Sequence, residues 1–270
     1  MKHRSSTSLL TRIAGIAGIA GLFLLSTAAQ AGVVSWTVYG VKREALVFEP
    51  TAKAEGGKVP LVFVFHGHGG NAEGAARNMG LQKAWPEALV VYMQGLPTQS
   101  KRDPEGRQNG WQRDGGDQGD RDLKFIDAAL AGLRGKYPVD DHRIYATGFS
   151  NGAFFTYLLW AERGKTFAAL APCAGLVWPT VHLSLPRPVL HIAGEADDIV
   201  PFDAQKKTIE LDRQINHAAE GAGVSCGEGC TRYPSSPKGN PVEVALHSGG
   251  HIFPPNAAAL IVRFFKEHSS

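Results

Sequence analysis

The chain carries a serine in the sequence context of a nucleophile. The motif G-x-S-x-G spans residues 148–152, with Ser150 at its centre. An apolar, β-branched run over 143–147 precedes the motif, and a helical pattern over 153–160 follows it. A strand, this motif and a helix in this order are typical of the sharp turn that exposes a serine hydroxyl at the end of a sheet. We therefore predict that Ser150 is a nucleophile for acyl transfer.

A histidine follows Ser150 at the position that a general base would take. The alternating run over 242–247 predicts a strand, and His251 lies on the loop just beyond its end. The imidazole of His251 would accept the Ser150 proton during attack on an acyl carbon. His247 is explained by the alternation of the strand itself, so that His251 is the better candidate base.

A carboxylate should orient this base. After Ser150, the apolar run over 188–192 leads into a loop that carries Asp197 and Asp198. A carboxylate there would hold the imidazole in one tautomer and stabilise its cation. The loop position leaves both aspartates open, with Glu195 as a weaker third candidate. One of the two aspartates could instead cap the helix that follows.

A glycine-rich loop predicts a site for developing negative charge. The continuous apolar run over 59–65 is typical of a strand buried on both faces of a parallel sheet. The segment 66–71 follows, and its glycines would let backbone N–H groups point at a substrate oxygen. The N–H of Asn151 would be the second donor. His66 and His68 could alternatively begin a zinc site, but Gly-Gly-Asn follows where a metal site would supply Asp and His. We therefore expect neither a metal nor a cofactor.

Four segments share one family pattern: LVFVFHGHGG at 61–70, YPVD at 137–140, RIYATGFSNG at 143–152 and GGH at 249–251. In this order they resemble the secreted polyhydroxybutyrate depolymerase and feruloyl esterase family, a branch of the α/β-hydrolases that includes acetylxylan esterases. The likeness runs from about Val38 to Phe265. The resemblance implies the α/β class and the α/β-hydrolase fold, with a mostly parallel central sheet and helices on both faces.

The resemblance also implies roles for particular residues. The family acid lies four residues before a proline, which selects Asp197 before Pro201. The oxyanion donors fall on the backbone of His68 and Asn151. The chain departs from the family pattern at Glu195, where Thr is usual, and at His68, where a smaller residue is frequent. These departures bear on substrate identity more than on the triad.

Four aromatic side chains are candidates for binding substrate. Trp111 lies in a polar loop over 95–119, and Trp178 follows a strand end. Either could stack on an aromatic acyl group, a sugar or a polyester repeat, or could pack beneath its loop. Phe149 beside the nucleophile and Phe253 near His251 could line the acyl pocket or pack under it.

The N-terminus predicts export. A basic start, an apolar core over 13–25 and the A-x-A site over 29–31 are typical of a signal peptide, not of a membrane anchor. Cleavage near Ala31 would remove the three basic residues by which 28 Lys and Arg exceed 25 Asp and Glu. Residues 32–270 would then form a single catalytic domain, secreted or periplasmic. A balanced charge predicts neither a nucleic-acid nor an anionic membrane partner, and we expect a monomer.

The cysteines agree with an oxidising compartment. Cys226 and Cys230 flank a short glycine-rich turn and predict a local disulfide. The alternative is a metal clip, for which no nearby Cys or His pair supplies the remaining ligands. Cys173 follows an apolar run and is expected to be an inert buried thiol.

The remaining pattern alternates strands and helices, which predicts a parallel sheet covered on both faces. The expected helices cover 71–85, 122–134, 203–219 and 256–267, and the further strands cover 88–93 and 166–173. An edge hairpin is expected over 33–48, and long polar loops are expected over 95–119 and 221–241.

The function predicted from these features is a carboxylic ester hydrolase that works through an acyl-enzyme. A peptidase or thioesterase on the same triad is the alternative, because this machinery attacks any activated acyl carbon. A non-catalytic binding protein with this fold is a further alternative. Such proteins usually lose a triad residue or one of the glycines that flank the serine, and all of these are present here. The sequence leaves the acyl group open among hydroxyalkanoate, ferulate, acetate and a synthetic polyester unit.

Overall fold

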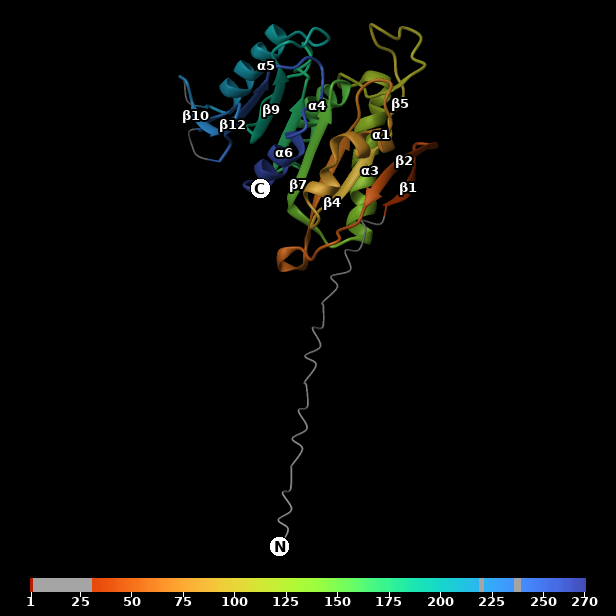
Figure 1. Cartoon of the computed structure of the whole chain (residues 1–270). Helices are drawn as coiled ribbons and strands as arrows, with labels where there is room; N and C mark the ends of the chain where they lie inside the picture. The colour runs from red at the N-terminus through yellow and green to blue at the C-terminus, as the bar shows by residue number, and fades with distance from the viewer. Residues whose placement is uncertain (2–30, 219–220, 236–238) are drawn as a thin grey trace.

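A ten-stranded sheet forms the centre of the molecule (Figure 1). The computed structural model describes residue 1 and residues 31–218, 221–235 and 239–270. Within them the strand order is β1-β2-β4-β3-β7-β8-β9-β12-β11-β10. Apart from Met1 and Ala31, the predicted signal peptide lies outside the described residues. In the described part of the chain, no helix has the length and apolar character needed to cross a bilayer.

The six central strands run parallel and are buried. They are β4 (Leu89–Met93), β3 (Val59–Phe65), β7 (Val139–Phe149), β8 (Ala169–Cys173), β9 (Val189–Gly194) and β12 (Val242–His247). Continuous apolar runs suit strands that are covered on both faces. The predicted strands over 59–65 and 242–247 are confirmed residue for residue.

Antiparallel hairpins form both edges of the sheet. β1 (Ala31–Val38) and β2 (Val41–Phe48) confirm the hairpin predicted over 33–48. At the opposite edge, β10 (Val224–Gly227) and β11 (Cys230–Tyr233) pair beside β12, where the sequence predicted a loop over 221–241. That prediction was wrong because the two strands are short and contain many polar residues. They show no apolar alternation in the sequence, and only their pairing in the folded chain defines them.

Helices cover the two faces of the sheet with separate cores (Figure 1). One face carries α1 (Ala72–Met79), α2 (Leu81–Ala84) and α6 (Ala257–Lys266). The other carries α3 (Arg121–Lys136), α4 (Asn151–Arg163) and α5 (Phe202–Ile215). These positions confirm the predicted arrangement of helices on both faces.

The helix predicted over 71–85 is two helices. Gly80 lies between α1 and α2 with φ 62°, a left-handed conformation that ends α1. Asn71 caps the start of α1, because its side-chain oxygen accepts a hydrogen bond from the Gly74 N–H at 2.7 Å. The sequence pattern did not separate the two helices because the apolar spacing continues across the glycine.

The polar loop predicted over 95–119 is confirmed in outline and contains three short elements. These are β5 (Leu96–Pro97) and β6 (Asn109–Gly110), which pair with each other, and the start of the 3-10 turn η2 (Asp117–Asp120). A second 3-10 turn, η1 (Glu55–Gly57), precedes β3. Because β5 and β6 pair apart from the main sheet, this loop can lie against the carboxyl ends of the central strands.

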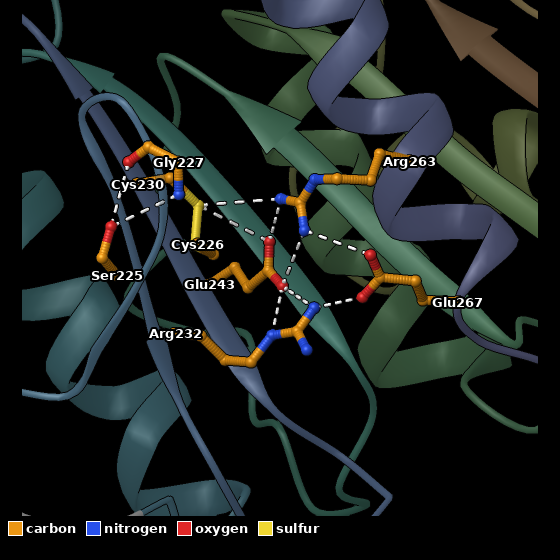
Figure 2. Close-up of a disulfide and its surroundings, with 8 residues drawn as sticks. All are labelled: Ser225, Cys226, Gly227, Cys230, Arg232, Glu243, Arg263 and Glu267. Carbon is orange, nitrogen blue, oxygen red and sulfur yellow. Dashed lines mark hydrogen bonds and ion pairs between the residues drawn. A yellow bond between two sulfur atoms is a disulfide. The ribbon is translucent and has the colours of Figure 1, made fainter.

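The disulfide between Cys226 and Cys230 joins β10 to β11, as predicted (Figure 2). Figure 2 shows that the Glu243 carboxylate of β12 lies beside it, between Arg232 and Arg263. Glu243 is fully buried, and it accepts hydrogen bonds from Arg232 Nε at 2.6 Å and Arg263 Nη2 at 2.5 Å. Two guanidinium groups therefore compensate the burial of one carboxylate at this edge.

Three side chains at this edge are of the types that could bind a metal ion. Among the described residues, the single group of three potential ligands is Cys226, Cys230 and Glu243. The two sulfurs are bonded to each other, and the Glu243 carboxylate is paired with Arg232 and Arg263. None of these three side chains is therefore available to bind a metal as the alternative of a metal clip requires. Cys173 is a buried free thiol, and burial raises its pKa, which agrees with the prediction of an inert side chain.

Candidate active site

Ser150 lies on a strained turn between β7 and α4. Its backbone has φ 55° and ψ −120°, a combination that an L residue rarely adopts. A Cβ atom on Gly148 would lie 2.3 Å from the Gly152 carbonyl oxygen, and one on Gly152 would lie 2.3 Å from the Phe65 carbonyl oxygen. Both flanking positions therefore require glycine, for the close approach that the sequence motif predicted.

Ser150, His251 and Asp197 form one line of hydrogen-bonded side chains. His251 Nε2 is 2.8 Å from Ser150 Oγ, and His251 Nδ1 is 2.8 Å from Asp197 Oδ2. They come from the turn after β7, from the loop after β9 and from the loop after β12, which are parallel strands in one sheet. Their carboxyl ends meet at one edge of the sheet, where a proton can pass from serine to imidazole.

The structure separates the two aspartates. Asp197 is 5% exposed, and its Oδ1 accepts hydrogen bonds from the N–H groups of Ile199 at 3.0 Å and Val200 at 2.9 Å. Asp198 and Glu195 are exposed. Asp197, the aspartate that the family resemblance selects, therefore has the fixed geometry that an orienting carboxylate would need.

The loop over 66–71 passes directly beside Ser150. A Cβ atom on Gly67 would lie 3.4 Å from the Ser150 Cβ. His66 holds this loop, because its Nδ1 donates to the Gly67 carbonyl at 2.7 Å and its Nε2 accepts from the Gly95 N–H at 3.0 Å. Burial lowers the pKa of His66, so that the ring is neutral. Both of its nitrogens are used within the fold, which removes the basis for a zinc site.

The two predicted oxyanion donors adjoin the serine. Asn151 is the first residue of α4, where a backbone N–H has no acceptor within the helix. His68 follows Gly67, and neither its N–H nor that of Asn151 has a hydrogen-bond partner among residues 31–218, 221–235 and 239–270. The side chain of His68 points elsewhere, with Nε2 3.2 Å from Ser100 Oγ and 3.4 Å from Asp103 Oδ2.

Trp111 is fully buried, which agrees with the second of its two predicted roles, packing beneath its loop. Its side chain has no exposed surface, and its ring stacks on Phe155. Its Nε1–H donates to the His66 carbonyl at 2.9 Å, and its backbone N–H donates to Asn151 Oδ1 at 2.7 Å. Trp111 thus connects the loop that carries His68 to the residue after Ser150. The sequence could not distinguish these roles because burial depends on how the loop over 95–119 folds.

A cavity of about 570 Å³ opens beside the triad. Phe149 and Phe253 line it together with His251, so that both candidates for an acyl pocket face the same cavity. Sequence reasoning missed the contribution of α1, whose Asn78 and Met79 also face the cavity, because nothing in the helical pattern marks them. The size suits one small organic group, and the wall combines apolar side chains with histidine and asparagine side chains.

Trp178 lies outside this cavity. It is half-buried, meets Phe154 edge-on at 5.9 Å, and lies under the Arg113 guanidinium at 4.6 Å. The four predicted aromatic candidates therefore separate into two that line the cavity, one that is buried behind it and one on a different surface.

Comparison with known proteins places the chain among esterases. The sequence pattern of the family "Esterase PHB depolymerase" matches residues 42–209. The protein named "Putative esterase NocK" from Nocardia uniformis subsp. tsuyamanensis is 30% identical over 72% of this chain. The match spans 65% of the length of that relative. Feruloyl esterase C from Emericella nidulans is 27% identical over 71% of this chain and 69% of its own length.

A solved structure shows the same fold. The acetyl xylan esterase from Aspergillus awamori aligns with a TM-score of 0.64 over 87% of this chain and 99% of that chain, at 14% identity. The mostly parallel sheet with helices on both faces is the α/β-hydrolase fold, as the sequence resemblance implied.

Trp111→Phe tests the connecting role of the indole. The substitution keeps an aromatic ring but removes the hydrogen bond to the His66 carbonyl, so that the loop over 66–71, which carries the expected oxyanion donor His68, loses one contact. Loss of a whole oxyanion donor costs about 10²- to 10³-fold in kcat, and we expect a smaller loss, roughly tenfold, with little change in KM. Turnover of a p-nitrophenyl ester measures both constants.

Trp160→Phe is the matched control for this experiment. Trp160 is equally buried, and its Nε1–H donates to the Leu185 carbonyl at 2.7 Å, away from the serine. Equal kcat losses in the two variants would contradict the proposed connection of Trp111 to the loop over 66–71.

Asp197→Asn and Asp198→Asn separate the two carboxylates functionally. Asn at 197 stabilises the wrong imidazole tautomer, and we expect kcat to fall by about 10⁴-fold with the fold retained. The exposed Asp198 should tolerate Asn within about tenfold, as expected of a surface position. Steady-state kinetics and circular dichroism provide the measurements, and the opposite ranking would transfer the acid role to Asp198.

Proposed function

The chain belongs to the PHB depolymerase family of esterases, and we propose that it hydrolyses carboxylic esters through an acyl-enzyme on Ser150. The observation that carries this proposal is the line of side chains Ser150–His251–Asp197, with 2.8 Å at both contacts, beside an open cavity. We further propose that residues 32–270 act as one exported domain after removal of the N-terminal segment.

The proposed reaction has two halves. As Ser150 Oγ attacks the ester carbonyl, His251 Nε2 accepts its proton, and Asp197 stabilises the imidazolium through Nδ1. The charge on the carbonyl oxygen is held by the backbone N–H groups of His68 and Asn151. Collapse of the tetrahedral intermediate expels the alcohol, which takes the proton from His251. A water molecule then repeats the sequence on the acyl-enzyme and releases the acid.

The substrate proposal rests on the cavity. The apolar side chains of Phe149, Phe253 and Met79 line it, and Asn71 and Asn78 add amide groups. This combination suits an aromatic acyl group that bears polar substituents, since an aromatic ring buries a large apolar area and its substituents need hydrogen bonds. Feruloyl esters of the plant cell wall have this character, and relatives of the chain carry the name feruloyl esterase. Acetyl esters and hydroxyalkanoate polyesters are the competing substrates.

Two other functions are less well supported. A peptidase or thioesterase would use the same three residues, but the family matched by residues 42–209 is an esterase family. A non-catalytic binding protein would have no need of the strained backbone at Ser150 or of a hydrogen-bonded imidazole.

Labelling of the nucleophile tests the acyl-enzyme. A serine-directed fluorophosphonate should modify the exported protein at Ser150 alone, as peptide mass spectrometry would show. Ser150→Ala should abolish labelling and lower kcat by roughly 10⁴- to 10⁶-fold, because nucleophile and base act as a unit. Near-normal turnover in Ser150→Ala would refute the mechanism.

A substrate panel tests the acyl group. Methyl ferulate, acetylated xylan, polyhydroxybutyrate film and p-nitrophenyl acetate should be compared by kcat/KM. We expect methyl ferulate to exceed p-nitrophenyl acetate after correction for leaving-group reactivity, because only the aromatic acyl group fills the cavity. Phe253→Ala should reduce this preference, and a preference for acetate or polyester that survives the substitution would reject the feruloyl proposal.

A further inference from the structure

A buried chain of hydrogen bonds leads from Asp197 away from the serine and into the fold. Gln205 Nε2 donates to Asp197 Oδ2 at 3.1 Å, and Gln205 Oε1 lies 3.2 Å from His191 Nε2. His191 Nδ1 is 2.7 Å from the Tyr157 hydroxyl, which is 2.8 Å from Asp212 Oδ2. The four residues beyond Asp197 have no exposed surface and belong to α5, β9 and α4.

The orientation of the Gln205 amide is determined by its neighbours. Its Nε2 faces two acceptors, Asp197 Oδ2 and the Val200 carbonyl oxygen at 2.7 Å. The amide nitrogen must therefore point toward Asp197, and the amide oxygen toward His191. Since Oε1 can only accept, His191 must carry a proton on Nε2.

The same reasoning extends to Tyr157. Burial lowers the pKa of His191 to about 4, so that the ring is neutral and its Nδ1 has a lone pair. The Tyr157 hydroxyl must then donate its only proton to His191 Nδ1. Its contact with Asp212 Oδ2 consequently requires a proton from the carboxyl group.

Asp212 has the surroundings of a neutral acid. It is fully buried on α5, and desolvation raises its pKa well above the ordinary value. Its second oxygen, Oδ1, has no hydrogen-bond partner in the described part of the chain. A buried carboxylate with one unsatisfied oxygen would be costly, whereas a protonated carboxyl group donates to Tyr157 and leaves only a carbonyl oxygen unpaired.

We propose that Gln205 is a positioning residue for the triad acid, and that Asp212, Tyr157 and His191 hold its amide with the nitrogen toward Asp197. This inference rests on the proposed function. Asp197 Oδ2 accepts from both His251 and Gln205, so the amide fixes the same carboxylate oxygen that receives the imidazole. If every hydrogen bond in the chain ran the other way, the Gln205 amide oxygen would face the Asp197 carboxylate. Asp197 would then lose the hydrogen bond that Gln205 donates to it.

The cost of this arrangement argues for a role beyond packing. Four polar side chains are buried between α4, α5 and β9, where apolar side chains of similar size would avoid the desolvation penalty. Every donor in the chain points in the same direction, from Asp212 toward Asp197. A network that served only to stabilise the helices would have no reason to end on the carboxylate that orients His251.

Tyr157→Phe interrupts the chain three hydrogen bonds from Asp197. We expect kcat to fall about tenfold with KM nearly unchanged, because a misplaced carboxylate weakens transition-state stabilisation and not substrate binding. The low-field proton resonance of the His251–Asp197 hydrogen bond should shift in this variant. Asp212→Asn should retain most activity, since the Asn amide can donate to Tyr157, and Asp212→Leu should resemble Tyr157→Phe.

Tyr145→Phe is the matched control. Tyr145 is also fully buried, and its hydroxyl donates to the His268 carbonyl at 2.6 Å with no connection to Asp197. It should lose a similar amount of thermal stability and keep both kcat and the His251 resonance. Equal kcat and an equal resonance in the two tyrosine variants would overturn the positioning role.

Nitrogen-15 NMR of histidine-labelled protein tests the proton order without an activity assay. At neutral pH, His191 should carry its proton on Nε2 alone. A proton on Nδ1, or on both nitrogens, would overturn the inference. This spectrum does not depend on turnover, so that a failure of Ser150 to react with fluorophosphonate would refute the proposed function and leave the tautomer result standing.

Discussion

The close approach of α4 to the end of β3 is the constraint on which the rest of the site depends. A side chain at Gly152 would collide with the Phe65 carbonyl oxygen, and one at Gly148 would collide with Gly152. Because the helix starts this close to the sheet, Ser150 takes a strained backbone with a positive φ at the turn between β7 and α4. The same geometry places Asn151, the first residue of α4, beside the loop after β3.

Burial then requires that each polar group around this turn finds a partner. On one side, Trp111 donates hydrogen bonds to both the His66 carbonyl and the Asn151 side chain. The solution on the other side is Gln205, which satisfies Asp197 and the Val200 carbonyl. The segments that carry the proposed oxyanion donors and the proposed triad acid are thus held by two residues with no exposed surface. Rigid support of this kind is what a site needs if its charges are to be preorganised.

The edge of the sheet formed by β10 and β11 supports the strand that leads to His251. β12 leads into the loop of His251, and its free side is covered by the β10–β11 hairpin with its disulfide. The buried Glu243 of the same strand is held by Arg232 and Arg263. The loop closed by Cys226 and Cys230 is short, so that its contribution to global stability is about 2 kcal/mol. We therefore expect its effect to be mainly local, on β12 and the loop that carries His251.

The sequence by itself determined the central strands, the positions of the proposed serine, acid and base after strand ends, and the disulfide, because apolar runs, glycines and paired cysteines are local signals. Tertiary structure decided what depends on burial and on distant partners. It made Trp111 a buried connector, opened the cavity against Asn78 and Met79, and turned the loop over 221–241 into a hairpin. It also joined Asp212 to Asp197 across two helices and a strand. Residues 191, 205 and 212 carry no motif, since a hydrogen bond between distant side chains exists only once the chain has folded.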